Sequence, residues 1–518
     1  MPERIRLAGL LGSFSFAGDL GRGQPMGHVL RTCRIAMRLA DQMKLSAAQR
    51  GDIYYTALLV HAGCTAGVSE FAAFLASDEL VAQREVCLCD PDNMGQLLGW
   101  MRRHVSPNAA APSRGLRLLQ VMLQGEKVFH DWEQGCSEVG SRIAARLGMP
   151  EDTQEALFGI CEMWNGKGPR KLKTAEIPLP ARVVNASMIL EVFLSAYDAD
   201  AARTAASTRR GKSFDPDVAD AFLSLASSDP FWSEVENEDP WDAVLDLEPQ
   251  PWRYSDARQL DDIAFAFADF VDLKAPNGSA HSRRTASLAE GIARRLGSSE
   301  EECDLVRRAA LVHDVGLVAV PSMVLQQGGR PSEADEERVR LHTYYTERIL
   351  SRSEALREIG AVAAMHHERA DGRGYHKGLA RSQTPLAGRI VAVAAAYDET
   401  SDQDAMGADA ALERLRRESE AALDPACVRA LAEELGVQMA KYQQERRSWP
   451  ADLTEREVEV LRLAATGQSV KDIAGRLVIS DHTARHHMES IYSKIGVSTR
   501  AAATLFAVEN DILALRRG

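Results

Sequence analysis

Five histidines and one aspartate recur between residues 281 and 367, and together they have the chemistry of a metal site. They are His281, His313, Asp314, His342, His366 and His367. Imidazoles with a shared carboxylate suit Fe, Mn, Zn or Ni, and two such metals can activate a water for attack on a phosphate ester. Asp314 is well placed to bridge them. A single histidine is more often a core or surface residue, but six candidates in this order indicate a site.

Helices must position these side chains. Both large parts of the chain contain long amphipathic runs with apolar residues at i, i+3 and i+4, and neither contains alternating strands. The sequence therefore predicts an all-α protein.

The first four hundred residues contain an internal repeat. In each copy a histidine, His28 or His281, precedes a second histidine at a nearly equal distance, in LLVHAG and in ALVHDVG. Further on, CEMWNGKGPRKL aligns with HERADGRGYHKGL and places Glu162 on Glu368. Both copies close on an Asp-Pro pair. A repeat unit of this length indicates two copies of one domain.

Two breaks in periodicity divide the chain. Residues 228–254 are acidic and aperiodic and contain Pro and Trp, which is typical of a linker. A second boundary lies near residues 442–454, where Pro450 breaks the helical periodicity. The predicted plan is a first domain over 1–230, an acidic linker over 231–254, a second domain over 255–445 and a tail domain over 450–518.

The tail contains capping residues at the expected ends of short helices. Thr454 and Glu457 form a capping box, and Ser480 can cap a later helix that runs to about Lys494. That helix has an apolar inward face and a polar outward face, the arrangement that enters a DNA major groove. Between residues 460 and 508 six basic residues oppose three acidic ones. A small packing module with solvated charges is the alternative interpretation.

The bulk composition limits the class of protein. A net charge of −13 argues against a chain that coats nucleic acid along its whole length, so any DNA contact must be a local patch. The eight cysteines show no CxxC pair, which favours reduced, mostly buried thiols. No apolar run approaches the ~20 residues needed to span a bilayer. We expect a cytoplasmic protein, with a short signal peptide at residues 7–18 as the alternative.

His313–Asp314 together with HHExxDGxGY at 366–375 resembles the HD-GYP branch of the HD phosphohydrolases. The resemblance implies an all-helical domain with two or three metals that typically hydrolyses cyclic di-GMP. It also implies catalytic roles for His313 and Asp314. The implied metal ligands are His281, His313, Asp314, His342, His366 and His367, and the implied substrate loop contains Glu368, Asp371, Gly372, Gly374 and Tyr375.

Four positions depart from that family's pattern. Leu317 stands where the family has a phosphate-binding Lys, and Ala395 stands where it has a late metal-binding Asp. Asn277 replaces the Glu of the third metal, and His376 replaces the Pro of GYP. Asp398, three residues after Ala395, is a candidate substitute metal ligand. These departures predict weak or absent turnover.

The first domain resembles the degenerate first domain of tandem HD-domain regulators. It has His61–Ala62 where HD is expected, and Ile160–Cys161–Glu162 where HHE is expected. His28 and His61 alone cannot hold two metals, so we expect no metal there. A structural or dimer-forming copy is the first interpretation, and a ligand-sensing pocket is the second.

The tail resembles the LuxR-type helix-turn-helix over LTEREVEVLRLAATGQSVKDIAGRLVISDHTARHHMESIYSKIGVSTR. This family places its recognition helix at SDHTARHHMESIYSKI and usually binds inverted repeats of double-stranded DNA as a dimer. The resemblance implies DNA-contacting residues at Lys471, Ser480, His482, Thr483, Arg485, His486 and Lys494.

The complete prediction is two tandem HD-type helical domains followed by a LuxR-type bundle. The main hypothesis is a homodimeric transcription regulator whose HD domains sense a metal, a nucleotide or another small ligand. The rival is a metal-dependent phosphodiesterase for cyclic di-GMP or another cyclic nucleotide, coupled to DNA binding. The third is a structural scaffold with two inert HD copies.

Overall fold

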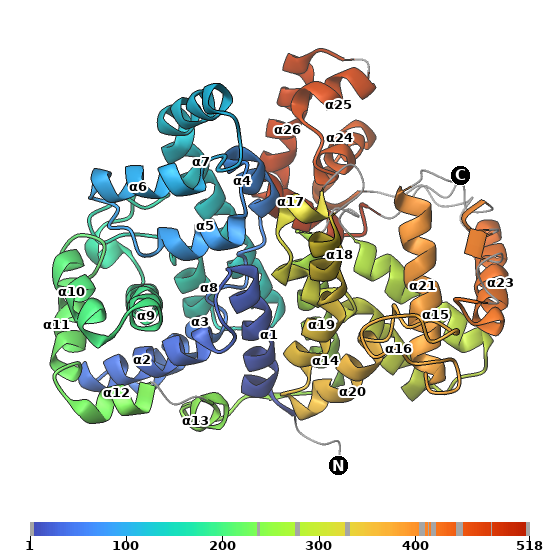
Figure 1. The fold of residues 1–518 in the computed structure, drawn as a ribbon, viewed down its shortest axis with the longest axis horizontal. Helices are drawn as coiled ribbons and strands as arrows, with labels where there is room; N and C mark the ends of the chain where they lie inside the picture. Colours follow the sequence, from blue (N-terminus) through green and yellow to red (C-terminus); the bar gives the residue numbers. More distant parts are fainter. Residues whose placement is uncertain are drawn as a thin grey trace. The chain divides into compact units, whose positions relative to one another are not determined.

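A computed structural model describes residues 5–235, 239–274, 280–326, 332–403, 410–412, 414–415, 421–441, 449–477 and 479–513. These residues are helical almost throughout (Figure 1). Two short strands, β1 (Ile5–Arg6) and β2 (Tyr254–Ser255), pair antiparallel in register Ile5 to Ser255. The predicted all-α fold is confirmed. The chain divides into two compact units, Met1–Gln259 with Pro321–Gln326, and Leu260–Val320 with Gln327–Gly518.

The first unit is built from helices packed around a core of small and aliphatic residues. Its helices are α1 (Leu7–Gly21), α2 (His28–Gln42), α3 (Ala47–Leu58), α4 (Val68–Leu75), α5 (Glu79–Val86), α6 (Met94–His104), α7 (Ala111–Arg146), α8 (Glu151–Phe158), η1 (Thr174–Glu176), α9 (Leu179–Ala196), α10 (Ala199–Arg209), α11 (Pro216–Leu225), α12 (Asp229–Val235), α13 (Trp241–Asp246) and α17 (Ser322–Leu325). Helix α1 covers the segment read as an alternative signal peptide, and it is buried on nearly all sides.

The segment predicted as a linker is folded where the structure describes it. Trp241 in α13 is buried and stacks on Phe16 with ring centroids 5.6 Å apart. Glu248 accepts hydrogen bonds from Tyr55 and from Arg6. The acidic, aperiodic composition was misleading because two tryptophans and one buried carboxylate are enough to anchor such a segment to a core. Residues 236–238 lie outside the described residues.

Helix α9 is apolar and 18 residues long, which by length and composition alone would let it cross a membrane. From the sequence no run of this length was expected. Within the first unit α9 packs against α2, and its buried Glu191 hydrogen bonds with His28 and Arg31. A mid-helix carboxylate that is buried and hydrogen-bonded in this way is typical of a helix in a protein core.

The second unit contains the helices that carry the metal-site candidates. They are α14 (Ala257–Asp272), α15 (His281–Arg295), α16 (Glu300–Val312), η2 (Val315–Ala319), α18 (Glu333–Arg340), α19 (His342–Leu350), α20 (Glu354–Ala363), α21 (Leu386–Gln403) and α23 (Pro425–Lys441). Helix α15 packs against α21, which carries Asp398, and against α16, which ends directly before His313 and Asp314.

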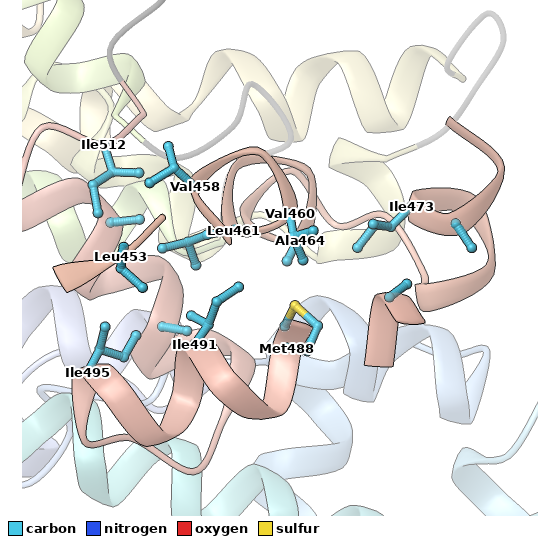
Figure 2. Packing of buried hydrophobic residues seen from close by; sticks show 14 residues of the cluster. Leu453, Val458, Val460, Leu461, Ala464, Ile473, Met488, Ile491, Ile495 and Ile512 are labelled. Carbon is cyan, nitrogen blue, oxygen red and sulfur yellow. The ribbon is translucent and has the colours of Figure 1, made fainter. Parts of the chain in front are cut away.

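The tail has a core of its own. It consists of η3 (Pro450–Asp452), α24 (Glu455–Ala465), α25 (Val470–Leu477), α26 (Asp481–Ile495) and α27 (Arg500–Glu509). The predicted capping box of Thr454 and Glu457 is present, and Ser480 caps α26 by accepting from the Thr483 backbone. Met488, Ile491 and Ile495 point from α26 toward α24 (Figure 2). The expected inward face is therefore confirmed.

Candidate metal centre and DNA-binding surface

His281, His313 and Asp314 form the first of two ligand triads in the second unit. His281 begins α15, and the other two directly follow α16. The His281 and His313 Nε2 atoms are 3.2 Å apart, and Asp314 Oδ2 lies 3.4 Å and 3.5 Å from them. The three donor atoms can therefore meet at one ion.

The second triad is His342, His366 and His367. His342 begins α19, and the adjacent pair follows α20. The His342 and His366 Nε2 atoms are 3.0 Å apart, and Asp314 Oδ1 lies 3.5 Å and 3.3 Å from them. Asp314 thus turns one carboxylate oxygen to each triad, which is the geometry of a ligand shared by two metals.

Backbone carbonyls set the orientation of three of these imidazoles. The Nδ1 atoms of His313, His342 and His366 lie 2.8, 2.6 and 2.8 Å from the carbonyl oxygens of Ala310, Val339 and Ala363. A proton on Nδ1 satisfies each carbonyl and leaves the Nε2 lone pair directed into the site.

The charge states also suit metal binding. Burial lowers the pKa of His313 to about 3, and burial lowers the pKa values of His366 and His367 as well. Burial opposes ionisation of Asp314, but the neighbouring histidines outweigh it and hold the pKa of that carboxyl well below its usual range. At neutral pH His313, His366 and His367 are thus neutral imidazoles beside one carboxylate, donors that a divalent transition metal accepts. Burial opposes ionisation of His281, but hydrogen bonds to Asp314 and Asp398 outweigh it and raise the pKa of His281 well above its usual value.

Asp398, predicted as a substitute ligand, lies behind His281. Its Oδ2 is 2.7 Å from His281 Nδ1, and its two oxygens accept from Nε and Nη2 of Arg284 at 2.8 Å each. The carboxylate therefore orients an imidazole through the ring nitrogen that faces away from the site.

Glu399 is a half-buried carboxyl that the sequence did not single out. It follows Ala395 by one turn of α21 and shares that helix face. Burial, reinforced by the charge of Asp314, raises the pKa of Glu399 to about 7, and the charges of His281 and His342 also act on it. The sequence signal for Glu399 was its position one helical turn after Ala395, where the HD-GYP pattern has an aspartate.

The remaining departures have plain structural positions. Leu317 is buried in η2, and Ala395 is buried in α21. His376 has its Nε2 3.3 Å from Glu347 Oε2. Asn277 lies outside the described residues. The buried leucine and alanine bring neither a cation nor a carboxylate to the site.

The predicted substrate loop folds around Glu368. Its carboxylate accepts from the backbone N–H groups of Lys377, Gly378 and Leu379, at 2.8, 3.2 and 2.7 Å. A Cβ on Gly374 would lie 2.4 Å from the His367 carbonyl oxygen, so only glycine permits this approach.

Three other loop residues have different surroundings. Asp371 accepts from Arg369 and from the Arg373 backbone, which lower its pKa to about 2. Gly372 has φ +73°. Tyr375 stacks on His367 with centroids 4.7 Å apart, so this ring lies beside the second triad.

The predicted DNA-contacting side chains are all exposed; they are Lys471, Ser480, His482, Thr483, Arg485, His486 and Lys494. Three are already engaged within the tail, and one of these contacts joins the Ser480 and Thr483 hydroxyls at 2.8 Å. Ser480 caps α26, and Lys494 Nζ lies 2.7 Å from Glu457 Oε2. Arg462 and Arg500 donate to backbone carbonyls of the same domain. Fewer basic side chains are therefore turned outward than the sequence count suggested.

The arrangement of the histidines and of the tail helices agrees with the protein families that this chain matches. Residues 266–427 match the HD domain family, and residues 451–507 match the luxR family of bacterial regulatory proteins. The chain is thus a protein with an HD domain and a C-terminal LuxR-type helix-turn-helix, and its relatives are HD-GYP phosphodiesterases.

Particular relatives extend the likeness beyond single domains. The 3'3'-cGAMP-specific phosphodiesterase 3 of Vibrio cholerae is 29% identical over 444 residues, covering 85% of this chain and 96% of that protein. The cyclic di-GMP phosphodiesterase response regulator RpfG of Xanthomonas campestris pv. campestris is 38% identical, covering 30% of this chain and 42% of that one. The crystal structure of a cyclic GMP-AMP specific phosphodiesterase of V. cholerae superposes with a TM-score of 0.59 at 27% identity, covering 84% and 98%.

Proposed function

We propose that the protein is a cytoplasmic, homodimeric DNA-binding regulator whose second HD domain binds a cyclic dinucleotide through a two-metal centre. The observation that carries the regulator is the exposed polar face of α26, with His482, Thr483, Arg485 and His486, above an apolar inward face. Such a helix can read base edges in a major groove while its other side stays in the core of the domain.

The ligand class follows from the donor set. Both triads and the shared Asp314 would hold two divalent ions, and such ions polarise phosphate oxygens and lower the pKa of a bound water. The protein itself supplies preset imidazole orientation through backbone carbonyls and Asp398. Cyclic dinucleotides are the substrates named for the relatives, and their phosphodiester groups suit this site.

A metal-dependent phosphodiesterase is the second candidate. It is favoured by the two complete triads and by Glu399, which places a carboxyl on the helix face that Ala395 leaves bare. It is opposed by Leu317, because a leucine cannot offset the charge of a phosphate in the transition state. If Glu399 takes the lost aspartate's part, Glu399→Gln abolishes any turnover that the wild type shows.

The test separates binding from turnover. Calorimetric titration with 3'3'-cGAMP and with cyclic di-GMP, run beside a chromatographic assay for cleaved product, is performed on metal-loaded wild type and on Asp314→Ala. Binding without product supports the regulator, and binding with product supports the phosphodiesterase. Equal affinity in both proteins, or no binding to either, contradicts the proposed site.

Arg485→Ala tests the DNA-binding half. Arg485 is exposed on α26, so we expect operator affinity to fall by about 1–3 kcal/mol with an unchanged melting temperature. Fluorescence anisotropy on DNA selected from a genomic library measures it. Lys494→Ala is the contrasting variant, because Lys494 is bonded to Glu457 and its removal lowers the melting temperature of the tail. Unchanged affinity in Arg485→Ala contradicts the recognition-helix assignment.

A further inference from the structure

The first domain contains hydrogen bonds equivalent to those that orient His281 in the second domain. Glu191 binds His28 Nδ1 and Arg31, as Asp398 binds His281 Nδ1 and Arg284. Asp19 accepts from the backbone at Gly27 and Val29, and Asp272 accepts from the backbone of Ser282. His28 and His61 therefore occupy the positions that His281 and His313 hold in the other copy.

Cysteines occupy the places of other ligands. A Cβ on Gly63 would lie 1.9 Å from the Cys136 carbonyl oxygen, and a Cβ on Gly316 would lie 1.9 Å from the His342 carbonyl oxygen. This shared close approach puts Cys136 at the position of His342. The alignment of Glu162 with Glu368 puts Cys161 at the position of His367.

A third cysteine belongs to the same group. Cys64 Sγ lies 3.5 Å from His61 Nδ1, and the Cys64 thiol hydrogen bonds with that of Cys136. Cys64 therefore joins the group through contacts with two of its members.

Two imidazole nitrogens in this group are buried without a partner. Among the residues that the structure describes, His28 Nε2 and His61 Nε2 have no hydrogen-bond partner, and the two residues are 0% and 4% exposed. Their rings are nearly parallel, with centroids 5.5 Å apart. Buried polar atoms are rarely left unsatisfied in native proteins, so these two point to a ligand.

We propose that His28, His61, Cys64, Cys136 and Cys161 form a binding site for a thiophilic metal ion, with Zn²⁺ as its natural class. Four of these five donors complete a tetrahedral shell of sulfur and nitrogen, which is typical of structural zinc. The shell would join α2 and α7 to the segments after α3 and α8. Ala62 replaces the shared carboxylate, so the ion is single and has no open position for water.

This inference reverses the sequence-based expectation that the first domain holds no metal. The donors are less tightly gathered than in the second domain: among the described residues, three donors approach within 4.8 Å only in the two triads there. A cysteine moves its sulfur by rotation about a single Cα–Cβ bond, so closing the shell needs rotamer changes and no new fold.

The test uses cobalt as the probe, because a thiolate bound to Co²⁺ gives a near-ultraviolet charge-transfer band and an imidazole–carboxylate site does not. Full-length Asp314→Ala protein, which lacks the shared ligand of the second domain, is reduced, stripped of metal and titrated with Co²⁺. We expect the band to saturate at one equivalent and to be bleached by one equivalent of Zn²⁺. No band, or a band that Zn²⁺ leaves unchanged, overturns the proposal.

Cysteine variants in the same background locate the ion. Cys64→Ser and Cys161→Ser should each lose most of the band, whereas Cys33→Ser, also buried in the first domain but outside the group, should keep it. Circular dichroism identifies any variant that fails to fold. If either Cys64→Ser or Cys161→Ser fails to fold, the band of the remaining folded variant tests the assignment. A band retained in both folded variants overturns the assignment. So does a Cys64–Cys136 disulfide in the purified protein that, once reduced, binds no cobalt.

Discussion

Asp398 illustrates how one carboxylate can support a candidate metal site from behind one of its histidines. Hydrogen bonding to His281 Nδ1 fixes the ring and increases its basicity, while Arg284 fixes the carboxylate. Loss of such a supporting group disturbs the ligand and leaves the rest of the site in place.

We therefore expect Asp398→Asn to weaken metal binding in the second domain by about 10–100-fold. Competition with a chromophoric chelator measures the affinity. Glu290→Gln, which removes a carboxylate paired with Arg294 on the surface, is the control and should bind metal as the wild type does. Wild-type affinity in Asp398→Asn would show that His281 needs no support.

At this scale the sequence predicted which residues gather but not how each is turned. The spacing of His313, Asp314 and the later pair indicated a shared site, and the structure brings them together. The direction of Asp398 depends on the rotation of α21 about its axis, and so does the approach of Glu399. A periodicity of 3.6 residues places both on nearly one face and cannot decide which one reaches the metals.

Between elements, one buried carboxylate adds polar contacts to the apolar packing of α24 against α26. Burial opposes ionisation of Glu457, but hydrogen bonds from Lys494, Thr454 and Ser490 outweigh it and lower the pKa of Glu457 to about 2. Thr454 was predicted as its capping partner. Lys494 was predicted to face DNA. Its contact with Glu457 could not be predicted, because the sequence alone does not show that α26 crosses α24 at this position.

Glu457→Gln should destabilise the tail by about 1–2 kcal/mol at pH 7. A carboxyl whose pKa is lowered on folding stabilises the native state above its unfolded value near 4.5, and this stabilisation is lost as the pH falls towards 2. The difference between wild type and variant should therefore shrink below pH 4.5. Thermal unfolding of residues 449–513, followed by circular dichroism across pH 3–7, measures it. A difference that stays constant with pH excludes the ionised carboxylate as its source.

The loop between α20 and α21 depends on a glycine. A Cβ at Gly374 would strike backbone atoms at 2.4–2.6 Å, and backbone cannot move aside as a flexible side chain can. Gly374→Ala should cost about 1–3 kcal/mol of unfolding free energy and move Tyr375 away from His367. Urea unfolding measures the first effect. Gly51→Ala in α3 is the control, since no described atom lies within 4 Å of that Cβ.

On the scale of the whole chain, the proposed regulator requires an energetic link between nucleotide and DNA. If a cyclic dinucleotide changes operator affinity by some factor, typically about 5–150-fold, the operator must change nucleotide affinity by the same factor. Both affinities are measured by anisotropy, with each ligand absent and then saturating. Asp314→Ala should abolish both effects while it retains operator binding. No effect in either direction would leave DNA binding independent of the site.

The two-part division of the chain was harder to predict than its helices. Composition marked residues 231–254 as a linker, yet Trp241 and Glu248 tie the described part of this segment to the first unit. Acidity and lack of periodicity report the average of a segment, whereas anchoring depends on a few large or buried side chains. The repeat was readable because hydrogen-bonded landmarks such as Glu162 and Glu368 keep their spacing when the residues around them change.

The paired arrangements behind His28 and His281 have a consequence for the redesign of this protein. The two copies differ at Ala62, Ile160 and Cys161 and agree in the carboxylates that orient the first histidine from behind. The first copy is therefore a suitable scaffold for design. The substitutions Ala62→Asp, Ile160→His and Cys161→His would give it the donors of the second copy on a framework that already orients His28.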